Sequence, residues 1–257
     1  EEGGAGGGAG GEGGARGARK NPALPPQVSS ADTLRHHLQG LARFECNVIH
    51  KSKGNGVVVE GGKAGFLVNN TIDDHAQYGV QIKAAASCLL ENNTISACMD
   101  CGVLASGCAA SVMEGNTLTG NKHGIVVAGG ALTVIRNTVE GCTGNGIVMG
   151  GTPLGKVISN HIRSPAMYCL LVEGATCDPV IKGNFMRDAV AGGGGGILVR
   201  GGGRGSFHGN EVFFNEVGVT LDGAGTLPCL RCVIRLLLSA FSLFAPELTH
   251  HAPFASQ

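Results

Sequence analysis

The sequence predicts an all-β fold, a right-handed parallel β-helix solenoid of about eight turns with three short strands in each turn. An Asn that lies two residues before an apolar residue recurs along most of the chain. A Gly followed by mainly apolar residues recurs with a similar period, and a third apolar stretch precedes most of these Asn. Three short apolar stretches per repeat, separated by Gly or polar corners, are typical of strands stacked into a solenoid.

The recurring Asn defines the length of the repeat. Successive members are separated by 23, 23, 23, 21, 23, 24 and 26 residues. Asn tolerates left-handed backbone angles at tight corners, and its amide both donates and accepts hydrogen bonds. We therefore predict a structural ladder of stacked amides rather than a ligand site. The members are Asn47, Asn70, Asn93, Asn116, Asn137, Asn160, Asn184 and Asn210.

The stretches that follow each Gly predict strands that line the core. Side chains alternate between the two faces of a strand, so the first and third residues after each Gly share a face. These positions are nearly all Val, Ile, Leu or Met, and we predict that they line the lumen. A helical repeat would need about ten residues without Gly, which none of the repeats offers.

The repeats divide the chain into four parts. Residues 1–28 are rich in Gly and Pro and predict a disordered segment followed by a linker. Residues 29–44 predict a short amphipathic helix, which we interpret as an N-terminal cap because the open end of a solenoid must be covered. Residues 45–225 contain the parallel β-helix, and residues 226–257 form a tail that is either a further cap or disordered. The apolar face of the predicted helix carries Leu34, Leu38 and Leu41.

Composition and charge argue against several classes of function. Lys+Arg and Asp+Glu both number 19, so the basic surface expected of a nucleic-acid binder is missing. The apolar stretch 232–245 is too short for a membrane span and is interpreted as a capping helix or as aberrant sequence. The 10 Cys are scattered, and several lie in apolar runs. This favours free thiols in a reducing compartment, and thus a cytoplasmic or nuclear location.

The residue two after each Gly should lie on the outer surface of the same strands. Enzymes built on such solenoids display carboxylates, Arg, Lys, His or Tyr along one strand face. Here the row is mostly apolar and contains no carboxylate, so a site for a sugar acid is not expected on it. We interpret it as a binding face for a protein or polysaccharide partner. The candidate residues are Val58, Gln81, Leu104, Val126, Val148 and Leu171.

Polar side chains gather at the corner that follows each Asn. Carboxylates beside a His favour acid–base chemistry in a carbohydrate-active enzyme, whereas charged corners are commonly only solvated, and both interpretations stay open. The candidate catalytic residues are Asp73, Asp100, His123 and Glu140. Counting from Asn places Asp73 in one column with Ser96, Thr119 and Glu140, and Asp100 in another with Gln77 and His123.

No metal site and no cofactor are predicted. Cys98 and Cys101 form one CxxC pair and Cys229 and Cys232 another, but more than 120 residues separate the pairs, whereas zinc ligand pairs lie closer. The Gly run 192–196 lacks the strand and helix that flank a phosphate-binding loop.

Two stretches of the repeats resemble a known family. Residues 47–82 and the sequence DPVIKGN at 178–184 are similar to right-handed β-helix repeats of the pectin-lyase-like superfamily. They resemble most the repeats of β-helix F-box-only proteins, which are substrate receptors of cullin-type ubiquitin ligases. The resemblance covers residues 45–222 and implies the fold, together with a partner-binding role. The helix predicted at 32–43 is not a three-helix F-box, and no catalytic residue of the family maps onto this chain.

Three hypotheses on function follow. The first is a non-catalytic recognition module that binds a protein or glycan along one face, one version being a substrate receptor in a ubiquitin-ligase pathway. The second is a polysaccharide lyase, hydrolase or C5-epimerase that acts at the polar corner. The third is a repeat scaffold whose surface has no dedicated site.

Overall fold

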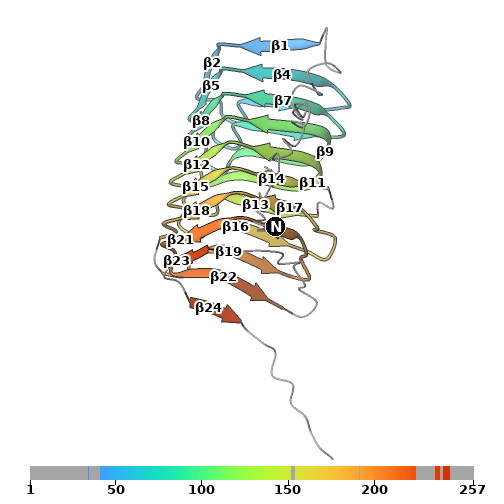
Figure 1. Cartoon of the computed structure of the whole chain (residues 1–257). Helices are drawn as coiled ribbons and strands as arrows, with labels where there is room; N and C mark the ends of the chain where they lie inside the picture. The colour runs from blue at the N-terminus through green and yellow to red at the C-terminus, as the bar shows by residue number, and fades with distance from the viewer. Residues whose placement is uncertain are drawn as a thin grey trace, which may run out of the picture.

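A computed structural model gives the fold of the chain, which is a right-handed parallel β-helix as the sequence predicts. The coils stack from β1 at one end to β24 at the other (Figure 1). Every strand pairs in parallel with the strand one coil away. The structure describes residues 34, 41–151, 154–190, 192–223, 235–237 and 240–243.

Each coil contributes strands to three faces. The first face is a nine-stranded sheet formed by the strands that follow the repeating Asn. These strands are β2 (Val48–His50), β5 (Thr71–Asp73), β8 (Thr94–Ser96), β10 (Thr117–Thr119), β12 (Thr138–Glu140), β15 (His161–Arg163), β18 (Phe185–Arg187), β21 (Glu211–Phe213) and β23 (Arg235–Leu237).

The second and third faces form one 15-stranded sheet, because β9 and β11 run through the corner between them. The second face, which follows the repeating Gly, contains β3 (Val57–Val59), β6 (Val80–Lys83), β9 (Cys101–Glu114), β11 (His123–Ile135), β13 (Ile147–Gly150), β16 (Tyr168–Glu173), β19 (Gly195–Arg200), β22 (Val217–Asp222) and β24 (Ala240–Leu243). The third face contains the ends of β9 and β11 with β1 (Ala42–Glu45), β4 (Ala64–Val68), β7 (Ser87–Glu91), β14 (Lys156–Ile158), β17 (Val180–Lys182) and β20 (Ser206–His208).

The lumen is filled mainly by apolar side chains, and its apolar rows stack like on like. On the second face Ile125 pairs with Ile147, which in turn pairs with Leu170. All three side chains are fully buried and belong to one core cluster that runs along the solenoid. The rows predicted from the Gly track therefore do line the lumen, and their burial is the main favourable contribution to folding.

The predicted Asn ladder is present and continuous. The Asn93 Nδ2 group donates to Asn116 Oδ1 at 2.9 Å and to the carbonyl oxygen of Leu67 at 2.8 Å, while the Asn93 backbone N–H donates to the same Asn116 Oδ1. The pattern repeats from coil to coil as far as Asn210. A buried column of amides in which most groups are satisfied is a structural element, since unpaired groups here would each be costly.

One part of the Asn argument is wrong. None of the ladder Asn has a positive φ; most of the left-handed residues lie elsewhere, in three columns that begin the three corners of each coil. Gly, Asn and Asp are common in them because their left-handed conformation costs little. The columns comprise the residue before each ladder Asn (for example Asn69, Asn92 and Gly115), the residue four after it (Asp74, Ala97 and Gly120), and a third set (Ala84, Gly107 and Gly129).

The predictions for the two ends fare differently. The predicted helix at 29–44 lies largely outside the described residues: Leu34 is helical, but Ala42–Glu45 is strand β1, paired with β4. In the tail, the stretch interpreted as a capping helix contains two strands instead, β23 paired with β21 and β24 paired with β22. Residues 1–28 and the rest of the tail also lie outside the described residues.

Candidate functional site

A groove runs along the outer side of the second face and crosses several coils. Its floor consists of outward-facing side chains of β9, β11, β13 and β16, and one edge is the corner that leads into these strands. We call it the second-face groove. It is lined by Tyr78, Asp100, Cys101, Leu104, His123, Val126, Asn145, Val148, Met167, Leu171, Glu173 and Arg200.

The floor is an aliphatic row. Leu104 pairs with Val126, Val126 with Val148, and Val148 with Leu171 in the parallel ladder. Val148 and Leu171 are only 8% and 5% exposed although they point away from the lumen, and they cluster with Leu198 of the next coil. An outer row of this kind has no polar group that could bond to a sugar hydroxyl or a peptide amide, so its contribution to binding is apolar contact.

Four of the six binding-face candidates line this groove: Leu104, Val126, Val148 and Leu171. The other two, Val58 and Gln81, lie in the same row on the two preceding coils, outside the groove. Gln81 is held by a hydrogen bond from Asn55 Nδ2 to its Oε1 at 3.0 Å. The predicted face and the groove thus coincide over the middle coils.

The polar edge is formed by the residue before each repeating Gly; of this column the sequence pointed only to His123 and, as part of a CxxC pair, to Cys101. Its members in the groove are Tyr78, Cys101, His123 and Asn145. The Oδ1 atom of Asn145 accepts the backbone N–H of Tyr168 at 3.0 Å, which leaves its amide nitrogen as a donor. Proximity to the Gly track was the sequence signal that could have identified this edge.

His123 is the titratable group at the centre of the edge. Its Nδ1 atom accepts the backbone N–H of Asn145 at 3.0 Å, so the proton of the neutral ring resides on Nε2. Burial, followed by the positive charge of Lys122, lowers the pKa of His123 below its usual value, while Asp100 acts in the opposite direction. A Cβ atom on Gly144 would lie 2.6 Å from His123 Cε1, so the absence of a side chain there leaves room for the ring.

Ion pairs lie near the two ends of the groove. Lys122 Nζ lies 3.7 Å from Asp100 at one end, and Arg200 binds Glu173 through two hydrogen bonds of 2.7 and 2.9 Å at the other. The two carboxylates are three coils apart, which is roughly 14 Å at the strand spacing. They therefore do not form a close pair.

The four candidate catalytic residues do not converge. Asp73 and Glu140 share one column through Ser96 and Thr119, as counted from the sequence, but this column lies on the first face and does not line the groove. Asp100 and His123 both line the groove, yet His123 pairs with Cys101 rather than with Asp100. Counting seven residues from the repeating Asn misplaces His123, because the corner between Asn116 and Gly124 is one residue shorter than the corners of the two neighbouring coils.

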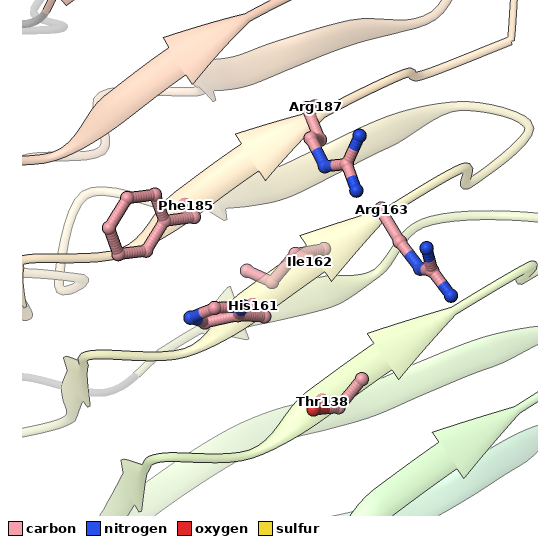
Figure 2. Close-up of a pocket in the computed structure, with 6 residues that line it drawn as sticks. All are labelled: Thr138, His161, Ile162, Arg163, Phe185 and Arg187. Carbon is pink, nitrogen blue, oxygen red and sulfur yellow. The ribbon is translucent and has the colours of Figure 1, made fainter.

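A second, smaller pocket lies on the first face, lined by Thr138, His161, Ile162, Arg163, Phe185 and Arg187 (Figure 2). The His161 and Phe185 rings are neighbours, with centroids 4.9 Å apart. Arg163 is paired with Glu140 at 2.6 Å, and Arg187 with Asp188 at 2.9 Å. Since each guanidinium already has a carboxylate partner, this pocket is not a strong anion site.

The cysteines of the described residues are free thiols, most of them buried. In the groove, burial and then the Asp100 carboxylate raise the pKa of the Cys101 thiol to about 12. A thiol must lose its proton to bind a metal, so this environment opposes metal binding. Within the described part of the chain there is no group of three or more His, Cys, Asp or Glu that could bind a metal ion.

Comparison with known families agrees with this architecture. A family model described as right handed beta helix region matches residues 29–162, which is more than half of the chain. The chain belongs to the right-handed β-helix family. A second family model, described as periplasmic copper-binding protein (NosD), matches residues 98–227. The closer resemblance to the F-box-only proteins stays a prediction.

A solved structure with the same fold is the A-module of mannuronan C-5 epimerase from Azotobacter vinelandii. It superposes with a TM-score of 0.54 at 16% sequence identity and covers 78% of this chain. The chain spans 58% of the length of that module, and the likeness concerns the fold alone. No curated protein matches the sequence. None of the described helical residues belongs to a segment that is long and apolar enough to cross a membrane.

The match to the periplasmic copper-binding family bears on the predicted location of the protein and raises the question of a copper site. The cytoplasmic or nuclear location inferred from the cysteines is contradicted, because the NosD family is periplasmic; buried thiols report on packing rather than on the compartment. Copper, which that family's name implies, does not fit the groove: its soft donors are a protonated Cys101 and Met167, with a single His.

Proposed function

We propose that the protein is a non-catalytic recognition module that binds an extended partner, a protein segment or a polysaccharide, along the second-face groove. The observation that carries this proposal is the continuous aliphatic floor beside an edge of hydrogen-bonding groups. From the coil of Tyr78 to the coil of Arg200 there are five steps, roughly 24 Å at the strand spacing. A shallow groove of that length suits a linear partner that lies along the solenoid axis.

The two parts of the groove would contribute differently. Contact with Leu104, Val126, Val148 and Leu171 would remove apolar surface from water, at about 25 cal/mol for each Å² buried. The donors of the edge would fix the position of the partner, because few polar groups placed beside an apolar surface commonly determine orientation. His123 is one such donor, since its neutral ring carries the Nε2 proton.

The charged groups of the groove support binding rather than hydrolysis. Glycoside hydrolysis by two carboxylates requires separations of about 5 to 9.5 Å. Asp100 and Glu173 are farther apart than that, and each is already paired with a cation.

The alternative of a carbohydrate-active lyase or epimerase rests on one observation. His123 is held neutral, as a general base must be, and it lies in the groove. Tyr78 is two coils away, roughly 10 Å, and burial raises the pKa of its hydroxyl, which opposes its use as a base. The third possibility, a scaffold with no dedicated site, predicts no partner at all.

The finer version of the proposal, a substrate receptor in a ubiquitin-ligase pathway, rests on the repeat resemblance alone. The match to a periplasmic family argues against it. Co-purification of a cullin-type ligase with the intact chain would support this version.

The test compares charged substitutions inside and outside the groove. Val126→Lys should abolish binding to whichever member of a peptide library or a polysaccharide panel the chain binds, since a cation would interrupt the floor. Val58→Lys is the matched control: it lies in the same row, is 43% exposed and is outside the groove, so it should leave binding intact. Equal loss in both variants, or no ligand in either panel, would contradict the proposal.

A parallel assay separates binding from catalysis. The intact chain and His123→Gln are incubated with polyuronates and neutral polysaccharides, and unsaturated, shortened or epimerised products are measured by NMR. We expect no turnover by either protein. Turnover that disappears in His123→Gln would replace the binding proposal with the enzyme alternative.

A further inference from the structure

We infer that the pocket on the first face, extended by two aromatic side chains of the next coil, binds a proline-rich segment of another protein in the polyproline II conformation. We call this surface the aromatic hollow. It lies on a different face from the second-face groove, so the inference does not depend on the proposed function. The residues that carry it are His161, Phe185, Arg163 and Arg187 in the pocket and Phe213 and Phe214 beside it.

The rings of the hollow form two pairs on the outer surface. The centroids of His161 and Phe185 lie 4.9 Å apart, and those of Phe213 and Phe214 lie 5.3 Å apart with the ring planes at 73°. Phe185 is 37% and Phe214 59% exposed. Exposed aromatic side chains of this kind are enriched at binding sites. In four earlier coils the position of Phe185 is occupied by Thr instead: Thr71, Thr94, Thr117 and Thr138.

Phe214 has a backbone conformation that packing within the solenoid does not explain. It begins the second corner with φ 54°, in the left-handed region where a bulky side chain is unfavourable. Its ring is largely exposed, so burial does not offset this strain. Strained residues gather at binding sites, and a ligand packed on the ring would supply the missing contact. The preceding coils place small or polar residues at this position: Asp74, Ala97, Gly120, Gly141, Ser164 and Asp188.

The other side of the hollow offers hydrogen-bond donors without net charge. Arg163 and Arg187 are neighbours in the ladder and lie across the strands from the two rings of the pocket (Figure 2). Within the described residues each guanidinium uses one nitrogen on a carboxylate, that of Glu140 or Asp188, and its other nitrogens still carry N–H groups. The balanced charge disfavours nucleic acid and anionic lipid headgroups as partners. Both carboxylates already have a partner, which disfavours their use as acceptors for sugar hydroxyls.

A polyproline II helix fits this chemistry. It has no internal hydrogen bonds, so its carbonyl groups can accept from the guanidinium N–H groups of Arg163 and Arg187. Its proline rings dock in grooves lined by aromatic side chains, as the rings of the hollow provide. The ligand therefore needs both an apolar face for the rings and free carbonyl groups for the donors, and a proline-rich segment offers the two together.

The spacing of the coils also matches this conformation. One turn of a polyproline II helix is three residues and about 9.3 Å long. Two coils of the solenoid, the step from His161 to Phe213, span about 9.6 Å. Every third residue of the segment thus meets an equivalent position of the solenoid. An extended strand, which repeats about every 6.8 Å, and an α-helix, with a pitch of about 5.4 Å, fall out of register within a few coils.

The test measures binding of fluorescein-labelled decaproline to the full-length protein by fluorescence anisotropy, beside a glycine–serine peptide of equal length. We expect the protein to bind decaproline and not the glycine–serine peptide. Phe185→Thr, which introduces the residue of the earlier coils, should weaken binding several-fold. Val180→Thr is the matched control, because Val180 is also 37% exposed but lies on the third face, and it should leave binding unchanged.

Three results would overturn the inference. The first is the absence of decaproline binding, and the second is equal binding by the unmodified protein and Phe185→Thr. The third is displacement of decaproline by a neutral oligosaccharide, because the hollow would then be a sugar site. Far-UV circular dichroism of Phe185→Thr verifies that the solenoid is intact, which Thr at this position of other coils leads us to expect.

A second variant separates a binding role of Phe214 from a structural one. Phe214→Gly introduces the residue that two other coils have at this position, Gly120 and Gly141, and Gly adopts the left-handed conformation without strain. We expect a higher temperature of thermal unfolding together with several-fold weaker binding of decaproline. A lower unfolding temperature with unchanged binding would show that the ring serves the fold and would overturn its assignment to the hollow.

Discussion

Two buried columns line the interior corners of this solenoid, and they differ in regularity. The first is the Asn ladder, in which every coil from Asn70 to Asn210 contributes the same residue. The second lies five residues later in each coil and changes identity from coil to coil. Its members are His75, Cys98, Asn121, Cys142, Pro165, Ala189 and Asn215.

Each polar member of the second column performs the task of a ladder Asn. His75 Nδ1 accepts the N–H of Ser52 at 3.1 Å, Asn121 Oδ1 accepts the N–H of Cys98 at 2.9 Å, and Asn215 Oδ1 accepts the N–H of Ala189 at 3.0 Å. Pro165 has no N–H and therefore needs no acceptor from the next coil.

This difference separates a structural corner from a variable one. At the first corner the coil geometry never changes, so a single solution repeats. At the second corner, the repeating Gly follows Asn121 by three positions, while Gly196 follows Ala189 by seven. The second-face groove borders this second corner. Because the length of this corner varies, different kinds of residue form the edge of the groove, and His123 lies beside Cys101 rather than Asp100.

The largest expected effect comes from breaking the regular column at its middle. Asn116→Ala removes the acceptor for both the backbone N–H and the Nδ2 group of Asn93. Leaving buried donors unpaired costs about 1–3 kcal/mol each, so we expect a loss of about 3 kcal/mol or more in the free energy of unfolding. Urea denaturation followed by circular dichroism measures it. A loss below about 1 kcal/mol would show that the ladder is dispensable.

The equivalent substitution in the irregular column should cost less. Asn121→Ala leaves one backbone donor, that of Cys98, without its acceptor. We expect a loss of about 1–2 kcal/mol by the same rule, measured in the same urea titration. If Asn121→Ala proves as damaging as Asn116→Ala, the two corners are equally structural and the comparison fails.

A substitution in one of the left-handed columns should stabilise the protein, in contrast to the two substitutions of Asn. Ala97 begins the second corner with φ 54°, is exposed, and is a residue for which this conformation is unfavourable. Ala97→Gly should stabilise the protein by about 0.5–1 kcal/mol, because the relief of strain exceeds the added flexibility of the unfolded chain. Ala128→Gly is the matched control: Ala128 is an exposed strand residue without positive φ, and its replacement should destabilise the protein. Thermal unfolding of the two variants distinguishes these signs.

The repeat is readable from the sequence because its determinants are local and periodic. The Asn track and the apolar positions after Gly correctly predicted the ladder and the lumen, and the outward row from Leu104 to Leu171 lies in the groove. Each of these depends only on strand alternation and on stacking of equivalent positions.

The features that could not be predicted depend on corner length or on tertiary packing. A deletion of one residue moved His123 beside Cys101, which a fixed count from Asn116 could not reveal. The contact of Leu34 with a cluster of the third face could not be predicted either, because amphipathicity predicts a buried face but not the surface that buries it. The tail resembled a helix in its hydrophobicity, yet 235–237 and 240–243 extend the two sheets.

The smallest expected effect concerns the pH response of the variable corner. The pKa of His123 in the folded protein is lowered by burial and by Lys122. As the pH falls below about 6.5, the usual value for His, the unfolded chain is protonated before the folded one. His123 therefore contributes stability that is present above that pH and is lost as the pH falls toward its folded pKa.

His123→Gln should reduce the slope of stability against pH between about 7 and 5. Lys122→Met should reduce it in part, because the pKa would rise toward its ordinary value. Urea midpoints measured across this range test both variants, and an unchanged slope in His123→Gln would mean that the ring is as accessible to protons in the folded groove as in the unfolded chain.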